Sequence, residues 1–341
     1  MLSHSLMRQE VHETPAAVEQ LLKQSMADLR AAGEKLRKLD PKVLTTIARG
    51  SSDHAATFFK YAVEMRCGIP VASLGPSLAS VYGTRLRLAG AAAVAISQSG
   101  RSPDIVALLK AARDGGAETI ALVNAQGSPL GEASGREILL RAGPERSVAA
   151  TKSFVCSIVA ALALLGHWSE DEPLLAALQA LPTHLDAALR MDWSTALEPC
   201  SKTKSLYTVG RGPGFAIAAE AALKFKEVAI LHAECFSGAE IAHGPVSLVE
   251  PGFPALAFLA ADASRPGLQD VCRRLHDAGA TVLAVGESPV GTGLPHAATG
   301  HALTEPLSMI LSFYAFAERL AREKGLDPDT PRGLKKVTET I

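Results

Sequence analysis

The sequence is poor in cysteine and in aromatic residues, and neither sign of charge is in excess. Its 341 residues include five cysteines and 5% aromatic residues, with 34 Lys plus Arg against 35 Asp plus Glu. The cysteines are scattered and form no CxxC or Cys/His cluster, which argues against disulfides and a structural zinc site. A net charge of −1 leaves no basic field for binding nucleic acid non-specifically.

Long apolar runs are also lacking. The most apolar segment, residues 155–166, is shorter than the roughly 20 residues that cross a bilayer, so we predict a buried helix there. The N-terminal residues 1–13 mix polar and charged side chains and contain no apolar core typical of a secretion signal. We therefore expect a cytoplasmic protein with neither a membrane nor a nucleic acid as its partner.

The chain contains an internal repeat. Residues 46–50 and 208–212 both read as a short apolar strand ending in Arg-Gly, 162 positions apart, and each precedes a helical pattern. Residues 109–123 and 274–285 repeat at nearly the same offset, each as a helix end, a Gly-Ala stop and a buried strand. This pattern favours two related halves; the alternative is chance similarity within one large sheet.

Short apolar runs alternate with helical patterns in both halves, which predicts parallel sheets covered on both faces. The fold class is therefore α/β, with two doubly wound halves and a helical bridge over residues 174–197. The expected strands lie near residues 43–48, 69–73, 92–96, 119–123, 137–140, 205–209, 254–259 and 281–285.

Two loops after predicted strands carry hydroxyl groups: Gly50-Ser51-Ser52 and the segment from Ser97 to Asp104. In the second loop, Ser102 suits a helix N-cap and Pro103 the first helical position. Neutral hydroxyls and free backbone N–H groups in front of a helix suit one phosphate group, although a plain capped turn is the alternative. No Walker motif is present, and residues 210–215 fail the GxGxxG pattern, which disfavours a nicotinamide cofactor.

A third region, residues 220–245, concentrates titratable side chains in an apolar span. Glu227, His243 and a lysine such as Lys224 supply the proton-moving carboxylate, the ring-opening acid/base and the cation that sugar isomerisation needs. A solvated Lys/Glu helix face is the plain alternative. A metal site is a further alternative, but its four residues lack HExxH or similar spacing: His232, Glu234, Glu240 and His243.

With these residues the chain resembles the SIS (sugar isomerase) family, and most closely the isomerase part of glutamine–fructose-6-phosphate aminotransferase and the stand-alone deaminases. The matching segments follow one another in the family's order: residues 7–15, Arg49–Ser52, Ser97–Gly100, Ala142–Lys152, Gly210–Gly212, Ala222–Glu227, His232–Glu234, His243–Pro245 and residues 331–338.

The resemblance implies two tandem SIS domains of flavodoxin-like three-layer α/β/α form. They would cover residues 1–185, with an N-terminal helix and the start of the bridge, and residues 186–326, with a tail over residues 327–341. It also implies a site for a phosphorylated amino sugar or ketose. The substrate-binding residues would be Gly50, Ser51, Ser52, Ser97, Gln98, Ser99, Ser102, Val148, Ala149 and Ala150.

The resemblance further assigns catalytic roles. Glu227 would move a proton between C1 and C2, and Lys224 would stabilise the developing charge. His243, supplied by the neighbouring subunit of a homodimer, would open the ring, and Lys336 could form a Schiff base with a ketose. No metal or organic cofactor is expected.

The sequence departs from the aminotransferase at Arg49, Arg101, Ala150, Gly333 and Lys335. The entry motif of the isomerase part also lies almost at residue 1, so we expect no glutaminase domain. Glucosamine-6-phosphate deamination to fructose 6-phosphate and ammonia is the favoured activity. The alternatives are action on another amino sugar or fructosamine phosphate, an aminotransferase-type activity with free ammonia, or a non-catalytic sugar-phosphate sensor.

Overall fold

The computed structural model describes residues 5–334 and 336, which fall into two compact units. The N-terminal unit comprises Ala16–Glu145, Lys152–Gln179 and Lys335–Ile341; the C-terminal unit comprises Met1–Pro15, Arg146–Thr151 and Ala180–Leu334. The division falls inside two helices, α1 (Leu6–Gln24) and α8 (Glu172–Ala188). The domain boundaries expected at residues 185 and 326 stay predictions, and most of the tail beyond residue 334 lies outside the described residues.

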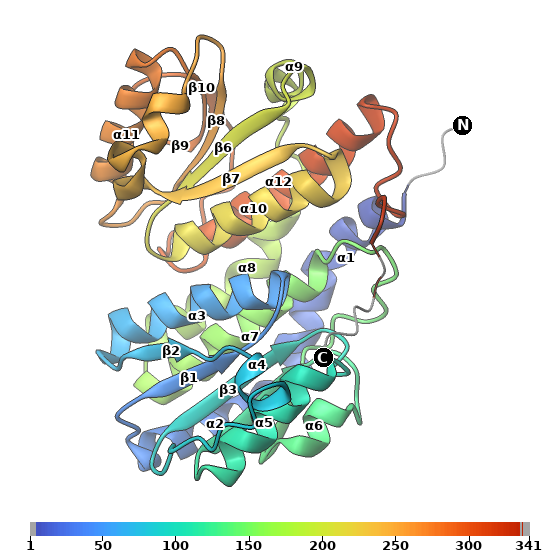
Figure 1. Ribbon diagram of the computed structural model, residues 1–341, viewed down its shortest axis with the longest axis vertical. Coiled ribbons are helices and arrows are strands. Elements are labelled where there is room, and N and C mark those ends of the chain that lie inside the picture. The colour runs from blue at the N-terminus through green and yellow to red at the C-terminus, as the bar shows by residue number, and fades with distance from the viewer. Residues whose placement is uncertain (1–4, 335, 337–341) are drawn as a thin grey trace. The chain divides into compact units, whose positions relative to one another are not determined.

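The N-terminal unit is built on a five-stranded parallel sheet in the order β2-β1-β3-β4-β5. Its central strand β3 is buried along its whole length, as expected for a sheet covered on both faces. In Figure 1, α3 and α7 cover one face of this sheet, and α5 and α6 cover the other; α2 packs against α7. The elements are β1 (Leu44–Ile47), β2 (Val71–Ser73), β3 (Ala92–Ser97), β4 (Glu118–Val123), β5 (Arg136–Leu139), α2 (Met26–Leu39), α3 (Ser51–Cys67), α4 (Ser77–Ser80), α5 (Pro103–Asp114), α6 (Pro129–Ala133) and α7 (Lys152–Ser169).

The C-terminal unit has a second parallel sheet in the order β10-β9-β8-β6-β7. Helices α10 and α12 pack together on one face, and α11 lies on the other (Figure 1). The elements are β6 (Ser205–Gly210), β7 (His232–Ser237), β8 (Pro254–Leu259), β9 (Thr281–Gly286), β10 (Thr292–Leu294), η1 (Ser194–Ala196), α9 (Leu197–Lys202), α10 (Pro213–Ala229), η2 (Gly238–His243), η3 (Pro245–Leu248), α11 (Arg265–Asp277) and α12 (Glu305–Glu323).

Both sheets have the same topology, with the first strand of each half between its second and third strands. This is the flavodoxin-like doubly wound order, so the predicted fold class is confirmed. The repeat extends to the backbone: Gly50 before α3 has φ 55° and ψ −133°, and Gly212 before α10 has φ 57° and ψ −134°. A side chain would strain this conformation, and glycine supplies it without cost.

All eight predicted strands are present, but β7 and β10 were not predicted. β7 lies at a sheet edge and has only one fully buried residue, Ala233, so it has no continuous apolar run. β10 is only three residues long. The predicted bridge is one helix, α8, followed by an irregular segment up to η1.

The apolar segment predicted as a buried helix is α7. By length and composition it could span a membrane, yet 89% of that stretch is buried inside the protein. It packs against α2 and α3 within the N-terminal unit. α7 is thus a core helix. It extends beyond the predicted segment at both ends, and Lys152 and Ser153 in its first turn are buried as well.

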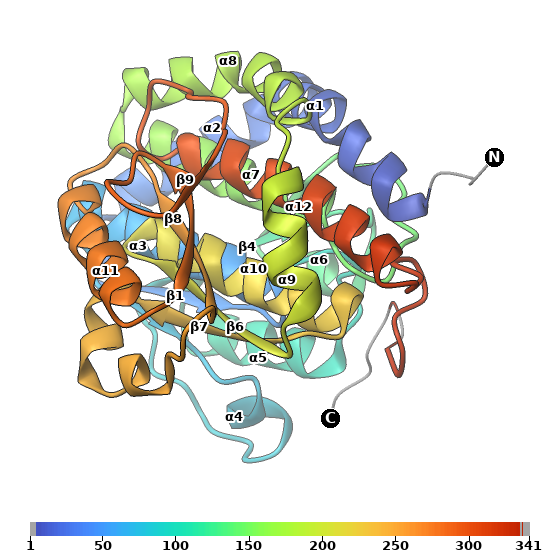
Figure 2. The same ribbon diagram turned by 90° about the horizontal axis from the view of Figure 1, so that it is seen from above.

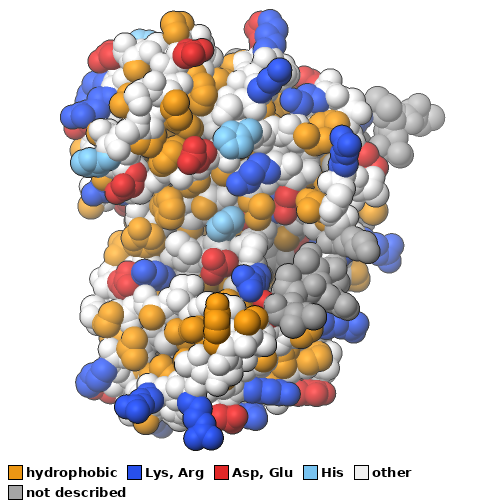
Figure 3. Space-filling view, in the orientation of Figure 1, with side chains coloured by type: hydrophobic (Ala, Val, Ile, Leu, Met, Phe, Trp, Pro, Cys, Tyr) orange, Lys and Arg blue, Asp and Glu red, His pale blue; other side chains and the backbone are white. Residues whose placement is uncertain are grey.

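The visible surface carries no large region of one charge. Lys and Arg side chains are interspersed with Asp and Glu over the face in Figure 3. In the N-terminal unit, α4 lies beside α5 at the periphery (Figure 2), and the chain that follows it exposes Val81 and Tyr82.

Candidate functional site

In the N-terminal unit the candidate site lies at the carboxyl ends of β1 and β3. The sheet reverses its winding direction between these neighbouring strands. Open α/β sheets bind ligands in the crevice outside such a switch point. The two hydroxyl-rich segments predicted to hold phosphate, Gly50–Ser52 and Gln98–Ser102, follow these two strands. The sheet topology therefore brings both segments to one edge.

The loop after β3 is held by its own hydroxyl groups. The Ser97 Oγ accepts a hydrogen bond from the Gly100 N–H at 3.0 Å, and the Ser99 Oγ accepts one from the Arg101 N–H at 3.3 Å. Gly100 has φ +62°, and a Cβ there would lie 2.3 Å from the Ser128 Oγ. The loop conformation thus requires glycine at this position. Gln98 and Ser99 are half-buried.

Ser102 and Pro103 occupy the predicted N-cap and first helical positions of α5. Within the described residues, however, the Ser102 side chain makes no hydrogen bond to the first turn of that helix. Ser128, which precedes Pro129 in the same way, accepts a bond from the Gly131 N–H at 3.2 Å. The Ser102 hydroxyl is therefore not used to cap α5 and can face a ligand.

An ion pair connects residues that flank the two segments, Arg49 and Asp104. The Arg49 guanidinium donates to one carboxylate oxygen of Asp104 from Nε at 3.0 Å and from Nη2 at 2.8 Å. Asp104 is fully buried, whereas the Arg49 side chain is about half exposed. We noted Arg49 only as a departure from the family, because nothing in a sequence pairs an arginine with a residue 55 positions away.

Ser51 and Ser52 form the first turn of α3, directly after Gly50, and both are half-buried. The next residue, Asp53, has a raised pKa because burial disfavours its charged form, an effect that His54 and Arg49 partly offset. The start of α3 therefore presents backbone N–H groups and two hydroxyls at the sheet edge.

In the C-terminal unit, Lys224 lies between two carboxylates on α10. Its side chain is fully buried, its Nζ lies 3.3 Å from Glu220 Oε1, and it also donates to Glu227 Oε2. Burial opposes the ammonium form, but Glu220 and Glu227 together outweigh that effect, so the pKa of Lys224 is raised. Lys224 is thus held as a cation. Glu227, with 20% of its side chain exposed, is the most accessible of the three groups.

Glu220 was not among the predicted site residues. Its carboxylate is fully buried and also accepts a hydrogen bond from the Tyr314 hydroxyl of α12 at 3.0 Å. The spacing of four residues between Glu220 and Lys224 was available as a signal. Burial, which makes this pair important, was not visible in the sequence.

The remaining residues of the third region lie on β7 and η2. His232 and Glu234 are exposed on either side of the buried Ala233 on β7, and His243 ends η2 as an exposed side chain. In the part of the chain that the structure describes, no three His, Cys, Asp or Glu residues are arranged to hold a metal ion.

Residues 146–151 belong to the C-terminal unit, where the buried Glu10 of α1 fixes their start. The Ser147 N–H donates to both Glu10 carboxylate oxygens at 3.3 Å. In the segment that follows, Ala149 is buried, while Val148 and Ala150 are half-buried. All three were predicted as substrate-binding residues, and this stays a prediction.

Lys336 lies in the N-terminal unit and donates to Glu145 Oε2 at 3.1 Å. Glu145 is buried and also accepts from the Ser153 N–H at 3.1 Å and from its hydroxyl at 2.6 Å. An ammonium paired in this way is not a nucleophile, so a Schiff base would require Lys336 to leave Glu145 and lose a proton.

The predicted residues thus form two sets. The phosphate-loop hydroxyls and Lys336 belong to the N-terminal unit, whereas Lys224, Glu227, His243 and residues 148–150 belong to the C-terminal unit.

Comparisons with known proteins identify the family of this chain. The SIS domain family model matches residues 39–166 and 200–292. The chain is 33% identical over 360 residues to the isomerizing glutamine–fructose-6-phosphate aminotransferase of Tropheryma whipplei (strain TW08/27), covering 97% of this chain and 58% of that protein. The chain therefore spans little more than half the length of this curated relative.

Two solved structures are similar over nearly the whole chain. A "putative phosphosugar isomerase" from Silicibacter pomeroyi DSS-3 has a TM-score of 0.93 and 50% identity, covering 96% of this chain and 100% of that one. Glucosamine-6-phosphate deaminase from Thermotoga maritima has a TM-score of 0.79 and 18% identity, covering 98% and 100%, so this second likeness concerns the fold alone. On the family match and these similarities, the chain belongs to the SIS domain family.

Proposed function

We propose that the chain is an SIS-type isomerase acting on a phosphorylated amino sugar, and that it converts glucosamine 6-phosphate to fructose 6-phosphate and ammonia. The observation that carries this proposal is the Glu220–Lys224–Glu227 group of α10. It combines an accessible carboxylate with a buried cation in contact with it. Proton transfer beside a carbonyl needs such a pair.

Glu227 is the group we propose for proton transfer. After ring opening by His243, the Glu227 carboxylate removes the proton from C2 and returns it to C1. The C1 carbonyl oxygen gains a proton, the C2 amine loses one, and C2 becomes an imine. Water then adds to the C2=N bond, and the collapse of that adduct leaves the C2 ketone and releases ammonia. The Lys224 ammonium favours the electron-rich intermediate because it is held as a cation at low dielectric.

The proposed phosphate site is the edge formed by Gly50–Ser52 and Gln98–Ser102. Hydroxyl and backbone N–H donors at two helix starts suit one phosphate group. We also propose that the protein acts in the cytoplasm as a homodimer, in which the exposed His243 serves the partner's site, and that it uses no cofactor. Lys336 would contact the sugar only after release from Glu145.

The test is to incubate the purified chain with glucosamine 6-phosphate and to measure fructose 6-phosphate and ammonia. We expect both products in equal amounts, and a loss of about 10²- to 10⁴-fold in kcat for Glu227→Gln with substrate binding retained. The matched control is Glu198→Gln, because Glu198 is an exposed helical glutamate that also pairs with a lysine.

A panel of other amino sugar and fructosamine phosphates completes the experiment. Turnover of another member in place of glucosamine 6-phosphate would replace the substrate but keep the reaction class. Binding of sugar phosphates without turnover of any would contradict the enzymatic proposal and indicate a sensor.

A further inference from the structure

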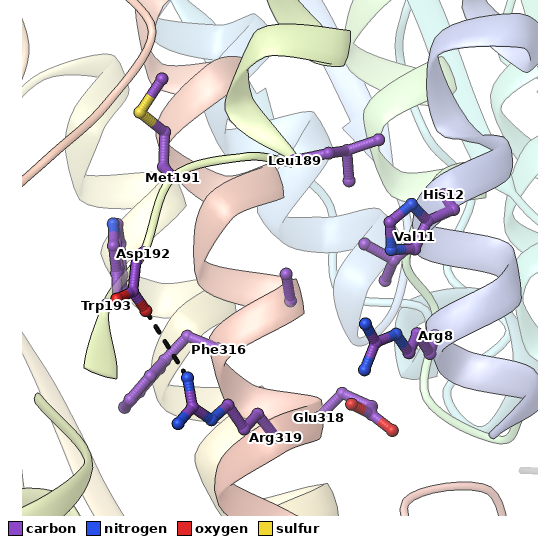
Figure 4. Close-up of a pocket in the computed structure, with 11 residues that line it drawn as sticks. Arg8, Val11, His12, Leu189, Met191, Asp192, Trp193, Phe316, Glu318 and Arg319 are labelled. Atoms are coloured by element: carbon purple, nitrogen blue, oxygen red, sulfur yellow. Dashed lines mark ion pairs between the residues drawn. The ribbon is translucent and has the colours of Figure 1, made fainter. Parts of the chain in front are cut away.

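A cavity outside the proposed site lies between α1, α12 and the segment that joins α8 to η1 (Figure 4). Its volume is about 160 Å³, and all of its walls belong to the C-terminal unit. It is lined by Arg8, Val11, His12, Leu189, Met191, Asp192, Trp193, Ala315, Phe316, Glu318 and Arg319. None of these residues has a role in the function proposed above.

Charged side chains gather at one end of the cavity, and the rest of the lining is mixed, with Asp192 beside Trp193 and His12 beside Val11 (Figure 4). Figure 4 shows Arg8, Glu318 and Arg319 together at one end, with Leu189 and Met191 far from them. The Trp193 and Phe316 rings line one side. Such a cavity fits a ligand with one charged group on an apolar body.

The acidic groups of the cavity already have partners. Glu318 accepts a hydrogen bond from the Ser5 hydroxyl at 2.7 Å. Asp192 accepts bonds from Ser194 N–H at 3.0 Å and its hydroxyl at 2.8 Å, which lower the pKa of Asp192. It also lies 3.5 Å from Arg319.

Arg8 differs from these groups. Its side chain is half-buried, and its guanidinium makes no ion pair with any of the described residues. A partly desolvated cation without a counter-charge favours an anion beside it. Because Glu318 and Asp192 bind other groups, Arg8 is the charged group of the lining that is left to pair with an anion.

The aromatic wall is fixed before any ligand arrives. The Trp193 indole N–H donates to the Pro295 carbonyl at 2.8 Å, and its ring centroid lies 5.8 Å from that of Phe316. Only 3% of Trp193 is exposed. A ligand that packs on this wall orders few side chains, which lowers the entropic cost of binding.

We propose that this cavity binds a small organic anion with a single carboxylate or phosphate group on an apolar ring. The anion pairs with Arg8 at the polar end, and the ring packs against Trp193 and Phe316. The cavity is smaller than the roughly 300–1,000 Å³ of sites for drug-sized ligands. The ligand is therefore about the size of benzoate.

The test uses benzoate and phenyl phosphate as probes, with benzyl alcohol as the uncharged control. The chain has two tryptophans, so its indole N–H resonances in ¹⁵N-labelled protein report separately on Trp193 and on Trp168, which serves as an internal control in the other unit. We expect at least one anionic probe to shift the Trp193 resonance and leave Trp168 unchanged. The comparison of the two probes distinguishes a carboxylate ligand from a phosphate ligand.

Arg8→Gln should weaken binding about 10- to 100-fold, the contribution of a charge-assisted hydrogen bond. Arg274→Gln, at an exposed arginine in the last turn of α11, is the matched control and should leave binding unchanged. Ala315→Leu keeps the charge but fills the cavity, and it should also abolish binding.

The proposal is overturned if neither anionic probe shifts Trp193, if benzyl alcohol binds as tightly as the anions, or if Arg8→Gln binds like the wild type. Should Arg8→Gln fail to fold, unchanged binding by Ala315→Leu would overturn it instead. These readouts do not depend on turnover, so they stand apart from the proposed enzymatic function.

Discussion

Replacing Glu220 by glutamine tests whether α10 depends on a buried charge network. The substitution keeps the shape of the side chain but removes one of the two negative charges beside the fully buried Lys224. Removing one partner of a buried ion pair costs about 3–5 kcal/mol. Glu227 remains, so we expect the lower end: the free energy of unfolding should fall by about 3 kcal/mol at pH 7, measured by urea denaturation.

The dependence on pH identifies the cause. In the wild type the pKa of Lys224 is raised, so its stabilising effect is present below the unfolded-state pKa and is lost as the pH rises through the folded-state value. In Glu220→Gln only Glu227 still opposes the effect of burial, so the Lys224 pKa should fall relative to that of the wild type. The variant then loses its buried charge as the pH rises, and the stability gap to the wild type should narrow between pH 7 and pH 10.

Glu198→Gln is the matched control, because Glu198 and Lys202 have the same spacing of four residues but are both largely exposed. It should leave stability unchanged. The double variant Glu220→Gln/Lys224→Met removes the buried cation and should recover most of the lost stability. A Glu220→Gln protein within about 1 kcal/mol of the wild type at pH 7 would refute the reasoning.

Three further expectations concern the loops and a buried carboxylate. Gly100→Ala should raise KM for the sugar phosphate at least tenfold, because its Cβ would collide with Ser128. Its control is Gly127→Ala, which has φ +64° but open space around it among the described residues. This control should cost only about 1–2 kcal/mol of stability and leave KM unchanged. Ser102→Ala should weaken phosphate binding without loss of stability, because the Ser102 hydroxyl does not cap α5. Ser128→Ala removes a cap hydrogen bond worth about 1 kcal/mol and should destabilise the fold. Loss of stability in Ser102→Ala but not in Ser128→Ala would contradict these two assignments. Burial raises the pKa of Glu305, but hydrogen bonds from His296 and a backbone N–H outweigh that effect, so the pKa of Glu305 is lowered. Below about pH 4.5 the wild type should therefore lose more stability than Glu305→Gln in urea titrations. Parallel acid profiles of the two proteins would exclude a stabilising role of the Glu305 carboxylate.

Most of the fold could be predicted because buried parallel strands are continuous apolar runs. Strands such as β3 and β8, buried at every position, were located to within one residue. The prediction missed β7, in which only one residue is fully buried, and β10, which has only three residues. Pairing across a sheet and exposure to solvent are properties of the folded chain, and neither leaves a periodic signal over so few residues.

The candidate site was predictable in its residue types but not in its contacts. Lys224 and Glu227 were chosen from their spacing, and the structure places them in contact; their role in a site stays a prediction. The partners Glu220 and Tyr314 lie 94 positions apart, and Arg49 and Asp104 lie 55 apart, so only the fold connects them. The pairing of Lys336 with Glu145 was also beyond the reach of sequence, because it joins residues 191 positions apart.

The paired glycine turns indicate how the two halves could acquire different roles after a duplication. Gly50 and Gly212 share a backbone conformation that other residues reach only with strain, so neither copy of the turn can change readily. The two copies of the turn differ at the positions that follow the glycine. There the first copy has Ser51 and Ser52, with two hydroxyls and their N–H groups, while the second has Pro213, which has no N–H to offer an anion. One proline thus leaves the second turn with one N–H group fewer for an anion than the first.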